Sequence, residues 1–213
     1  MSELKLFLND EEIEVGIDEA GRGCLMGRVY AGAVILPREF PDDTYLQIKD
    51  SKRLSEKKRL MLMEYIKTHA IAYGVGYAEI EEIDKLNIYH ASILAMHRAL
   101  DEIKTSFDRI LVDGDRFKAY YNSDGDFPSY TCIKKGDNKM FSIAAASILA
   151  KCSRDNYVRD IVKENPDYSV FGWLTNKGYG TKIHIDGLHH NGLTKYHRLT
   201  FTPCNNITLQ FKS

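Results

Sequence analysis

The chain has 213 residues, of which 44% are hydrophobic and 28% are charged, and its formal net charge at pH 7 is −1. This composition excludes an intrinsically disordered chain, because disorder requires low hydrophobicity and a high net charge. The balanced charge also argues against a protein held on nucleic acid by bulk charge alone, although it allows a local basic groove.

The cysteines and the apolar runs bear on where the protein works. Cysteines at positions 24, 132, 152 and 204 lie far apart without a CxxC pair, so they predict neither a zinc site nor a disulfide framework. The first residues show no secretion signal, and no run reaches the roughly 18–20 apolar residues of a membrane span. We therefore expect a cytoplasmic protein with no membrane contact.

Five segments have the composition of short β-strands. They are rich in Val, Ile, Ala or Tyr, and turn-forming residues such as Asp, Pro or Gly follow them. In chain order they are residues 13–17, 28–36, 71–79, 109–112 and 130–133.

Helical patterns lie between and after these strands. Ser55 and Asn87 are good N-cap residues for two helices, and a third is predicted over about 142–164, with an alanine-rich first half. Strands alternating with helices predict an α/β fold, a mixed sheet flanked by helices, whose strand order the spacing does not reveal. We expect one main domain, residues 1–165, and a C-terminal extension with short helices, residues 166–213.

Carboxylates follow three of the predicted strands. Asp18 and Glu19 follow the first strand, Asp113 follows the fourth, and Asp137 lies just before the long helix. Ligands of open α/β sheets gather beyond strand ends, so these four side chains are candidates for one site. A solvated turn is the alternative for an isolated Asp-Glu pair, and spacing alone does not decide between the two.

A converged set of four carboxylates would need cations to offset its repulsion. Hard oxygen ligands suit Mg²⁺ or Mn²⁺. Two such ions about 3.5–4 Å apart can clamp a phosphodiester, activate a water and stabilise the leaving oxygen. The acids therefore favour metal-dependent phosphodiester hydrolysis.

Seven motifs in register resemble ribonuclease HII. They are GIDEAGRG (16–23), DSKRLS (50–55), LNIYHAS (86–92), VDG (112–114), KGD (135–137), SIAAASILAKCSRD (142–155) and NKGYGT (176–181). The resemblance extends from about residue 14 to about residue 203. It implies a ribonuclease H-like fold, with the C-terminal extension forming part of the substrate groove.

The resemblance also implies an activity and its catalytic residues. The family cuts the RNA strand of RNA–DNA hybrids, and cuts 5′ of single ribonucleotides in duplex DNA, leaving 3′-hydroxyl and 5′-phosphate ends. A divalent cation, Mn²⁺ or Mg²⁺, is the implied cofactor. The implied catalytic residues and metal ligands are Asp18, Glu19, Asp113 and Asp137.

Four further residues resemble the family's means of telling RNA from DNA. Gly21, Arg22 and Gly23 resemble the loop whose backbone meets the ribonucleotide 2′-hydroxyl, and small glycines allow that approach. Tyr179 resembles the tyrosine that packs on the deoxyribose at the RNA–DNA junction. The 2′-hydroxyl is the one group that separates RNA from DNA at a given position, so this loop offers a physical route to the specificity.

Basic residues near the motifs are candidates for phosphate contacts. Lys52 and Lys151 lie inside matched motifs, so we expect them to contact the substrate. For Arg53 and Arg154 a solvated helix face is an equal alternative. Arg28 stands where family members often carry Pro, and it could contact a phosphate or face solvent.

The segment after Pro166 is rich in histidine and lysine. Adjacent histidines diverge on a helix, so their spacing is poor for a single metal site. We expect instead a positively charged wall over the substrate. Its members would be His184, His189, His190, His197, Lys177, Lys182, Lys195 and Arg198.

Other acidic residues are expected to be structural. Asp115 lies outside the matched motif and is interpreted as a turn residue. The acids at 79, 81, 82 and 84 are interpreted as a solvated helix start, where they favour the helix dipole.

The resemblance implies RNA–DNA hybrids and ribonucleotide-containing DNA duplexes as partners. The GRG loop and the short segment before the first strand favour type HII over the related type HIII. The C-terminal residues show no clear sliding-clamp motif, and we expect a monomer. Two alternatives stay open: a catalytically silent duplex-binding module, and a DNA nuclease on the same fold, which would need no reader of the 2′-hydroxyl.

Overall fold

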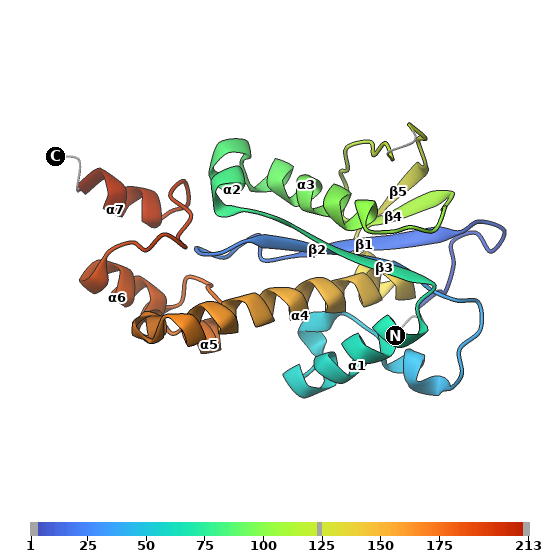
Figure 1. Ribbon diagram of the computed structural model, residues 1–213, viewed down its shortest axis with the longest axis horizontal. Helices are drawn as coiled ribbons and strands as arrows, with labels where there is room; N and C mark the ends of the chain where they lie inside the picture. Colours follow the sequence, from blue (N-terminus) through green and yellow to red (C-terminus); the bar gives the residue numbers. More distant parts are fainter. Residues whose placement is uncertain (1–3, 123–124, 211–213) are drawn as a thin grey trace.

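The computed structural model describes residues 4–122 and 125–210. Its five strands form one mixed sheet in the order β3-β2-β1-β4-β5 (Figure 1). Strands β1, β2 and β3 are antiparallel neighbours, whereas β4 and β5 run parallel to β1. Their bounds are β1 (Glu14–Ala20), β2 (Val29–Ile35), β3 (Ala72–Ala78), β4 (Arg109–Asp113) and β5 (Ser129–Ile133). All five predicted strands are present, and the predicted mixed α/β fold is confirmed.

The end of β1 differs from the prediction. Residues 18 and 19 lie inside this strand and not after it, because the antiparallel pairing with β2 continues to Ala20 opposite Tyr30. The parallel pairing with β4 ends earlier, at Ile17 opposite Val112. The two acids of β1 therefore lie where their neighbouring strand β4 ends.

Helices cover both faces of the sheet (Figure 1). The long helix α4 (Phe141–Glu164) packs on β1 and β2 from one side, and α1 (Glu56–His69) packs outside it. Helices α2 (Ile80–Leu86) and α3 (Ile88–Asp101) cover the other side. Ser55 caps α1 and Asn87 caps α3, as predicted. Among the described residues, no helix is both long and apolar enough to cross a membrane.

Small residues let α4 lie close to the sheet. A Cβ atom added to Gly16 of β1 would lie 2.3 Å from the backbone of Ser142, and one added to Gly32 of β2 would lie 2.4 Å from the carbonyl oxygen of Ala146. Contacts this short leave no room for a side chain. The close packing fixes the start of α4, and the turn before it, against the carboxylate-bearing end of β1.

The C-terminal helices gather beyond the far end of α4 (Figure 1). They are α5 (Trp173–Asn176), α6 (Lys182–Asn191) and α7 (Cys204–Gln210). The short 3₁₀ helix η4 (Pro166–Phe171) precedes them, and three others lie earlier in the chain: η1 (Asp43–Gln47), η2 (Ser51–Arg53) and η3 (Gly136–Asn138). One apolar cluster joins Trp173 and Leu188 of this region to Met26 and to Val158 of α4. The predicted short helices are present, and the division of the chain at residue 165 stays a prediction.

Candidate active site

Four carboxylates lie where β1, β4 and η3 meet. Asp18 and Asp137 are buried, while Glu19 and Asp113 are partly exposed. Burial, and then repulsion from Glu19, Asp113 and Asp137, holds the pKa of Asp18 well above its ordinary value. Burial likewise raises the pKa of Asp137, with Asp113 and Asp50 adding to the effect. The strand ends thus bring the four predicted acids into one electrostatic site.

Each carboxylate has a local hydrogen-bond or ion-pair partner. Asp113 accepts a bond from the backbone N–H of Gly136 at 2.6 Å, and this bond ties β4 to η3. Asp18 accepts from the N–H of Glu19 at 2.7 Å, Asp137 accepts from Asn138 at 2.8 Å, and Glu19 pairs with Arg22 at 3.3 Å.

These oxygen ligands have the chemistry that Mg²⁺ or Mn²⁺ requires. In the part of the chain that the structure describes, no three His, Cys, Asp or Glu side chains are gathered tightly enough to hold one ion. The donor set therefore fits a divalent cation, but some carboxylates must turn from their local partners to share one.

The pKa of Lys52 is shifted by the charges of this site. Burial opposes its charge, but nearby Asp18, Asp50 and Asp137 raise its pKa above the ordinary value. Lys151 lies further along α4 and pairs with the buried Asp155 at 2.7 Å. Lys52 therefore lies within the electrostatic field of the carboxylates, whereas Lys151 already has an acidic partner.

The Gly21–Gly23 loop and Tyr179 lie side by side, although they are far apart in the sequence. Cys24 and Tyr179 form an isolated β-bridge, and a Cβ atom added to Gly23 would lie 3.7 Å from the Tyr179 ring. Tyr179 is 44% exposed, so part of the residue is open to a ligand. The structure thus brings together the residues that resemble the family's ribonucleotide reader.

A pocket of about 270 Å³ adjoins Glu19, Arg22 and Asp113. Sequence reasoning assigned no role to three of its other lining residues, Tyr89 and Ser92 of α3 and Arg116 after β4. The LNIYHAS motif contains Tyr89 and Ser92 and was the sequence feature that could have identified them. Arg116 carried no signal, because only the fold brings it to the pocket.

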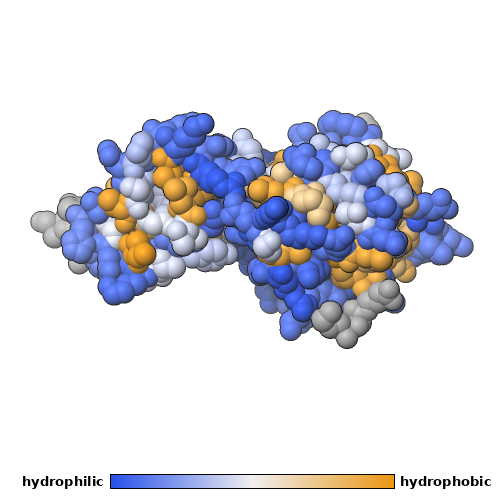
Figure 2. Space-filling model, turned by 90° about the horizontal axis from the view of Figure 1, so that it is seen from below, coloured by the Kyte–Doolittle hydropathy of each residue, from blue (hydrophilic) through white to orange (hydrophobic). Residues whose placement is uncertain are grey.

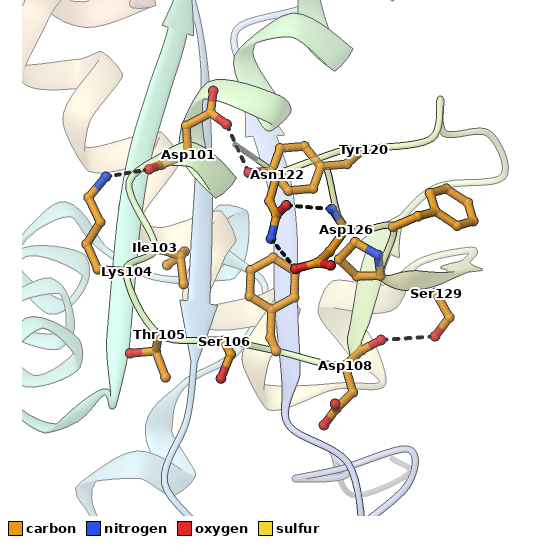
Figure 3. Close-up of a pocket in the computed structure, with 13 residues that line it drawn as sticks. Asp101, Ile103, Lys104, Thr105, Ser106, Asp108, Tyr120, Asn122, Asp126 and Ser129 are labelled. Carbon is orange, nitrogen blue, oxygen red and sulfur yellow. Dashed lines mark hydrogen bonds between the residues drawn. The ribbon is translucent and has the colours of Figure 1, made fainter. Parts of the chain in front are cut away.

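A larger pocket, of about 790 Å³, lies at the opposite end of the sheet, beside the starts of β4 and β5 (Figure 3). Several of its polar groups bond to one another. Lys104 donates to the carbonyl of Asp101 at 2.8 Å, and the Tyr120 hydroxyl donates to the Asp101 carboxylate at 2.9 Å. We therefore assign the chemistry to the carboxylate end and not to the larger pocket.

The expected wall of positive charge is wrong for three of its members. His184, His197 and Arg198 are buried, because the C-terminal helices pack around them. Trp173 donates to Nε2 of His184 at 2.9 Å, and the same nitrogen lies 3.1 Å from Nε2 of His197. Burial lowers the pKa of both histidines, that of His197 to about 3, so they are uncharged at neutral pH. His189 and His190 are exposed on α6, and Lys177, Lys182 and Lys195 are partly or fully exposed.

Two of the arginines are held by groups of the protein. Arg28 is partly exposed, pairs with Glu79 at 2.7 Å and lies over the ring of Tyr77. Arg154 is buried and donates to backbone carbonyls. Arg53 is exposed and donates to Asn138 at 3.3 Å, next to the carboxylate site.

The acids at the start of α2 also do more than face solvent. Glu82 pairs with Arg98 of α3 at 2.7 Å, and Asp84 accepts from the backbone N–H groups of Leu199 and Thr200. The predicted helix start is confirmed, and Glu81 is exposed as expected. The expected solvation is wrong for Glu82 and Asp84, because α3 and the C-terminal segment lie against them. Asp115 lies in an exposed bend, as expected.

Comparison with solved structures identifies the fold. The crystal structure of ribonuclease H2 from Pyrococcus horikoshii OT3 superimposes with a TM-score of 0.75 at 22% identity, over 94% of this chain and 99% of that one. Bst-RNase HIII in complex with Mn²⁺ matches with a TM-score of 0.69 at 17% identity, over 94% of this chain and 70% of that one. The fold is therefore that of the type 2 ribonucleases H.

Sequence comparison gives the family within that class. The sequence model of the Ribonuclease HII family matches residues 15–204. The ribonuclease HII of Bacteroides fragilis is 52% identical over 195 residues, 92% of each chain, and that of Pelagibacter ubique is 44% identical over 196 residues, 92% of this chain and 99% of that one. The chain belongs to the ribonuclease HII family. It is an endoribonuclease that cleaves RNA in RNA–DNA hybrids and cuts 5′ of ribonucleotides embedded in DNA.

Proposed function

We propose that this enzyme cleaves by two-metal-ion catalysis, with water as the nucleophile and Mn²⁺ or Mg²⁺ as the cofactor. The observation that carries the proposal is that Asp18 and Asp137 are buried near each other and neither forms an ion pair within 4 Å among the described residues. Buried carboxylates without cations are costly, and bound metal ions offset that cost. The proposed ligands are Asp18, Glu19, Asp113 and Asp137.

Metal ions bound there would supply an activated water and stabilise the leaving 3′-oxygen, so that the cut leaves a 3′-hydroxyl and a 5′-phosphate. The chain's own contribution is to hold the carboxylates on rigid elements. The bond from Gly136 to Asp113 joins β4 to η3, and the packing of α4 on Gly16 holds η3 near β1. Bst-RNase HIII, which shares the fold, was solved in complex with Mn²⁺, and this supports a divalent cation at the proposed site.

The reader of the ribonucleotide is proposed to have two parts. The backbone of Gly21, Arg22 and Gly23 would meet the 2′-hydroxyl, and the exposed face of Tyr179 would pack on the neighbouring deoxyribose. The position of Gly23 supports this arrangement, because a Cβ atom added there would lie 3.7 Å from the tyrosine ring, so two adjacent sugars of one strand can reach the loop and the ring together. The hybrid or mixed duplex would lie along the hydrophilic middle of the molecule, between the C-terminal helices and the sheet (Figure 2).

Lys52 and Lys151 are proposed to contact the substrate. Lys52 is well placed to meet a phosphate that approaches the metal ions, because it already lies in the field of Asp18 and Asp137. Lys151 would have to share its charge between the substrate and Asp155. We also propose a cytoplasmic enzyme that works as a monomer without a clamp tether.

Replacing Asp18 by Asn is expected to stabilise the protein in the absence of metal. The raised pKa means that the Asp18 carboxyl favours folding at low pH, and that this stability is lost as pH rises through the folded-state pKa. The Asn variant removes the repulsion at neutral pH, and each 1 kcal/mol regained raises the melting temperature by about 2–4 °C. Thermal unfolding with a chelator, from pH 4 to pH 8, measures the difference.

Adding Mn²⁺ should then raise the melting temperature of the unmodified protein and have little effect on Asp18→Asn. Asp115→Asn is the matched control, because Asp115 is exposed and pairs with Lys134 at 3.6 Å, outside the proposed ligand set. An equal response to Mn²⁺ in all three proteins would count against the proposed metal site.

A further inference from the structure

Two arginines are buried beside the loop of residues 21–28, which begins with the GRG motif. Arg154 of α4 is 1% exposed, and Arg198, between α6 and α7, is 0% exposed. Within residues 4–122 and 125–210, neither forms an ion pair with an acidic side chain within 4 Å. Burying a charge without an acidic partner costs free energy unless its hydrogen bonds are made. The groups that accept hydrogen bonds from these two guanidinium groups therefore show which backbone segments the arginines hold in place.

Arg198 ties together both ends of the loop that begins with the GRG motif. Its Nη1 donates to the carbonyl of Arg22 at 3.0 Å, its Nε to Gly27 at 2.8 Å and its Nη2 to Arg28 at 3.2 Å. The backbone N–H of Arg198 also donates to the carbonyl of Leu25, at 2.9 Å. A planar guanidinium presents its donors in a rigid fork, so one side chain fixes several carbonyls at once.

Arg154 joins the same loop to the segment that carries Tyr179. Its Nη1 donates to the carbonyl of Lys177 at 2.7 Å, and its Nη2 to Met26 at 3.2 Å. Its side chain also fills the space beside Gly21, where an added Cβ atom would lie 2.2 Å from Nε of the arginine. Gly21 has φ +99°, which favours glycine, so both backbone and arginine require the absence of a side chain.

Backbone bonds complete this junction. The N–H of Leu25 donates to the carbonyl of Gly178 at 2.9 Å, and the N–H of Gly27 donates to Tyr196 at 2.8 Å. The turn between β1 and β2 thus reaches the C-terminal helices (Figure 1). The β1–β2 turn and the C-terminal segment come from opposite ends of the chain, so their alignment depends on these contacts.

We propose that Arg198 and Arg154 are positioning residues that hold the 21–28 loop and Tyr179 in the alignment needed to read one ribonucleotide. The inference rests on the proposed roles of the GRG loop and Tyr179. Neither arginine needs to touch the substrate, because each acts through the backbone that it holds. A misplacement of about 1 Å near the reacting groups can cost about 100-fold in rate.

Arg198→Lys is the first test. Lysine keeps the charge but is a point donor on a flexible stem, so it does not bridge three carbonyls. For a DNA duplex with one ribonucleotide, we expect kcat to fall by about 10- to 100-fold, the scale of such a misplacement, with little change in the Kd for the duplex. Arg109→Lys is the matched control, because Arg109 uses three nitrogens on Glu12 and Thr131 at the start of β4.

A double-mutant cycle with Tyr179→Ala separates positioning from general stability. Because Arg198 is proposed to align the 21–28 loop with Tyr179, adding R198K to Y179A should cost clearly less than R198K costs in the unmodified enzyme, since coupled residues do not add. Losses that multiply fully would overturn the positioning role. A normal rate for Y179A alone would instead overturn the proposed reader role of the tyrosine, and the positioning inference with it.

Arg154→Lys replaces R198K in the cycle if the latter does not fold, because it removes only the bonds to Lys177 and Met26. The same sub-additive result is expected with Y179A. Melting temperatures of all variants, measured beside R109K, show that rates are compared for folded protein. A kcat for R154K equal to that of R109K would contradict the inference.

Discussion

Replacing Asp113 by Asn is expected to abolish cleavage of a duplex that contains one ribonucleotide while leaving the fold intact. The amide oxygen of Asn can still accept the bond from Gly136, so the link between β4 and η3 survives. What is lost is the negative charge of one proposed metal ligand. Loss of a single group that stabilises charge in the transition state costs about 10²–10³-fold, and loss of a metal ligand should reach or exceed the upper value.

Single-turnover cleavage with Mn²⁺ and with Mg²⁺ measures this loss, and circular dichroism checks the fold. Asp115→Asn is again the control, since it removes the same charge two residues further on, from an exposed side chain. A wild-type cleavage rate for Asp113→Asn would remove Asp113 from the proposed ligand set.

Replacing Tyr179 by Ala is expected to slow cleavage at the RNA–DNA junction without unfolding the segment. The carbonyl of Tyr179 lies 3.0 Å from Nδ1 of His184, whose Nε2 receives the bond from Trp173, so Nδ1 carries the proton and donates it. This buried network holds the backbone when the ring is removed. Stacking of a base on an aromatic side chain contributes about 1–3 kcal/mol, and packing of the ring on a deoxyribose should fall at or below this range, so we expect a loss of up to about 150-fold in kcat/KM.

Tyr179→Phe is the informative partner variant, because it keeps the ring face and removes only the hydroxyl. We expect it to retain most of the activity on a duplex with one ribonucleotide. Steady-state rates for the two variants, compared on the same labelled duplex, test the role of the ring. Equal losses for Phe and Ala would assign the function to the hydroxyl, and no loss for Ala would contradict the proposed reader.

Local patterns were enough to predict the five strands and the three main helices. Ser55 and Asn87 cap their helices as expected, because capping depends on side chains within the same turn. The end of β1 was predicted wrongly, because Asp18 and Glu19 owe their strand conformation to pairing with β2. Strand order also escaped prediction, because it depends on contacts between segments that are distant in the chain.

The candidate site shows the same division. The carboxylates and the GRG loop could be found from motifs, but the burial of Arg154, Arg198 and His184 could not. A histidine or arginine in a polar segment is typical of an exposed surface. These three side chains are buried only because the C-terminal helices pack on α4 and on the turn after β1. Those long-range contacts also determine how the 21–28 loop and Tyr179 are held relative to each other.

The most direct test of the proposed site and reader uses two labelled DNA duplexes of the same sequence, one with a single ribonucleotide and one without. Each is incubated with the protein and Mn²⁺ or Mg²⁺, and again with a chelator. We expect one metal-dependent cut on the 5′ side of the ribonucleotide, with 3′-hydroxyl and 5′-phosphate ends, and no cut in the control duplex. Equal cutting of both duplexes would contradict the reader of the 2′-hydroxyl, and no cutting of either by folded protein would contradict the proposed catalytic site itself.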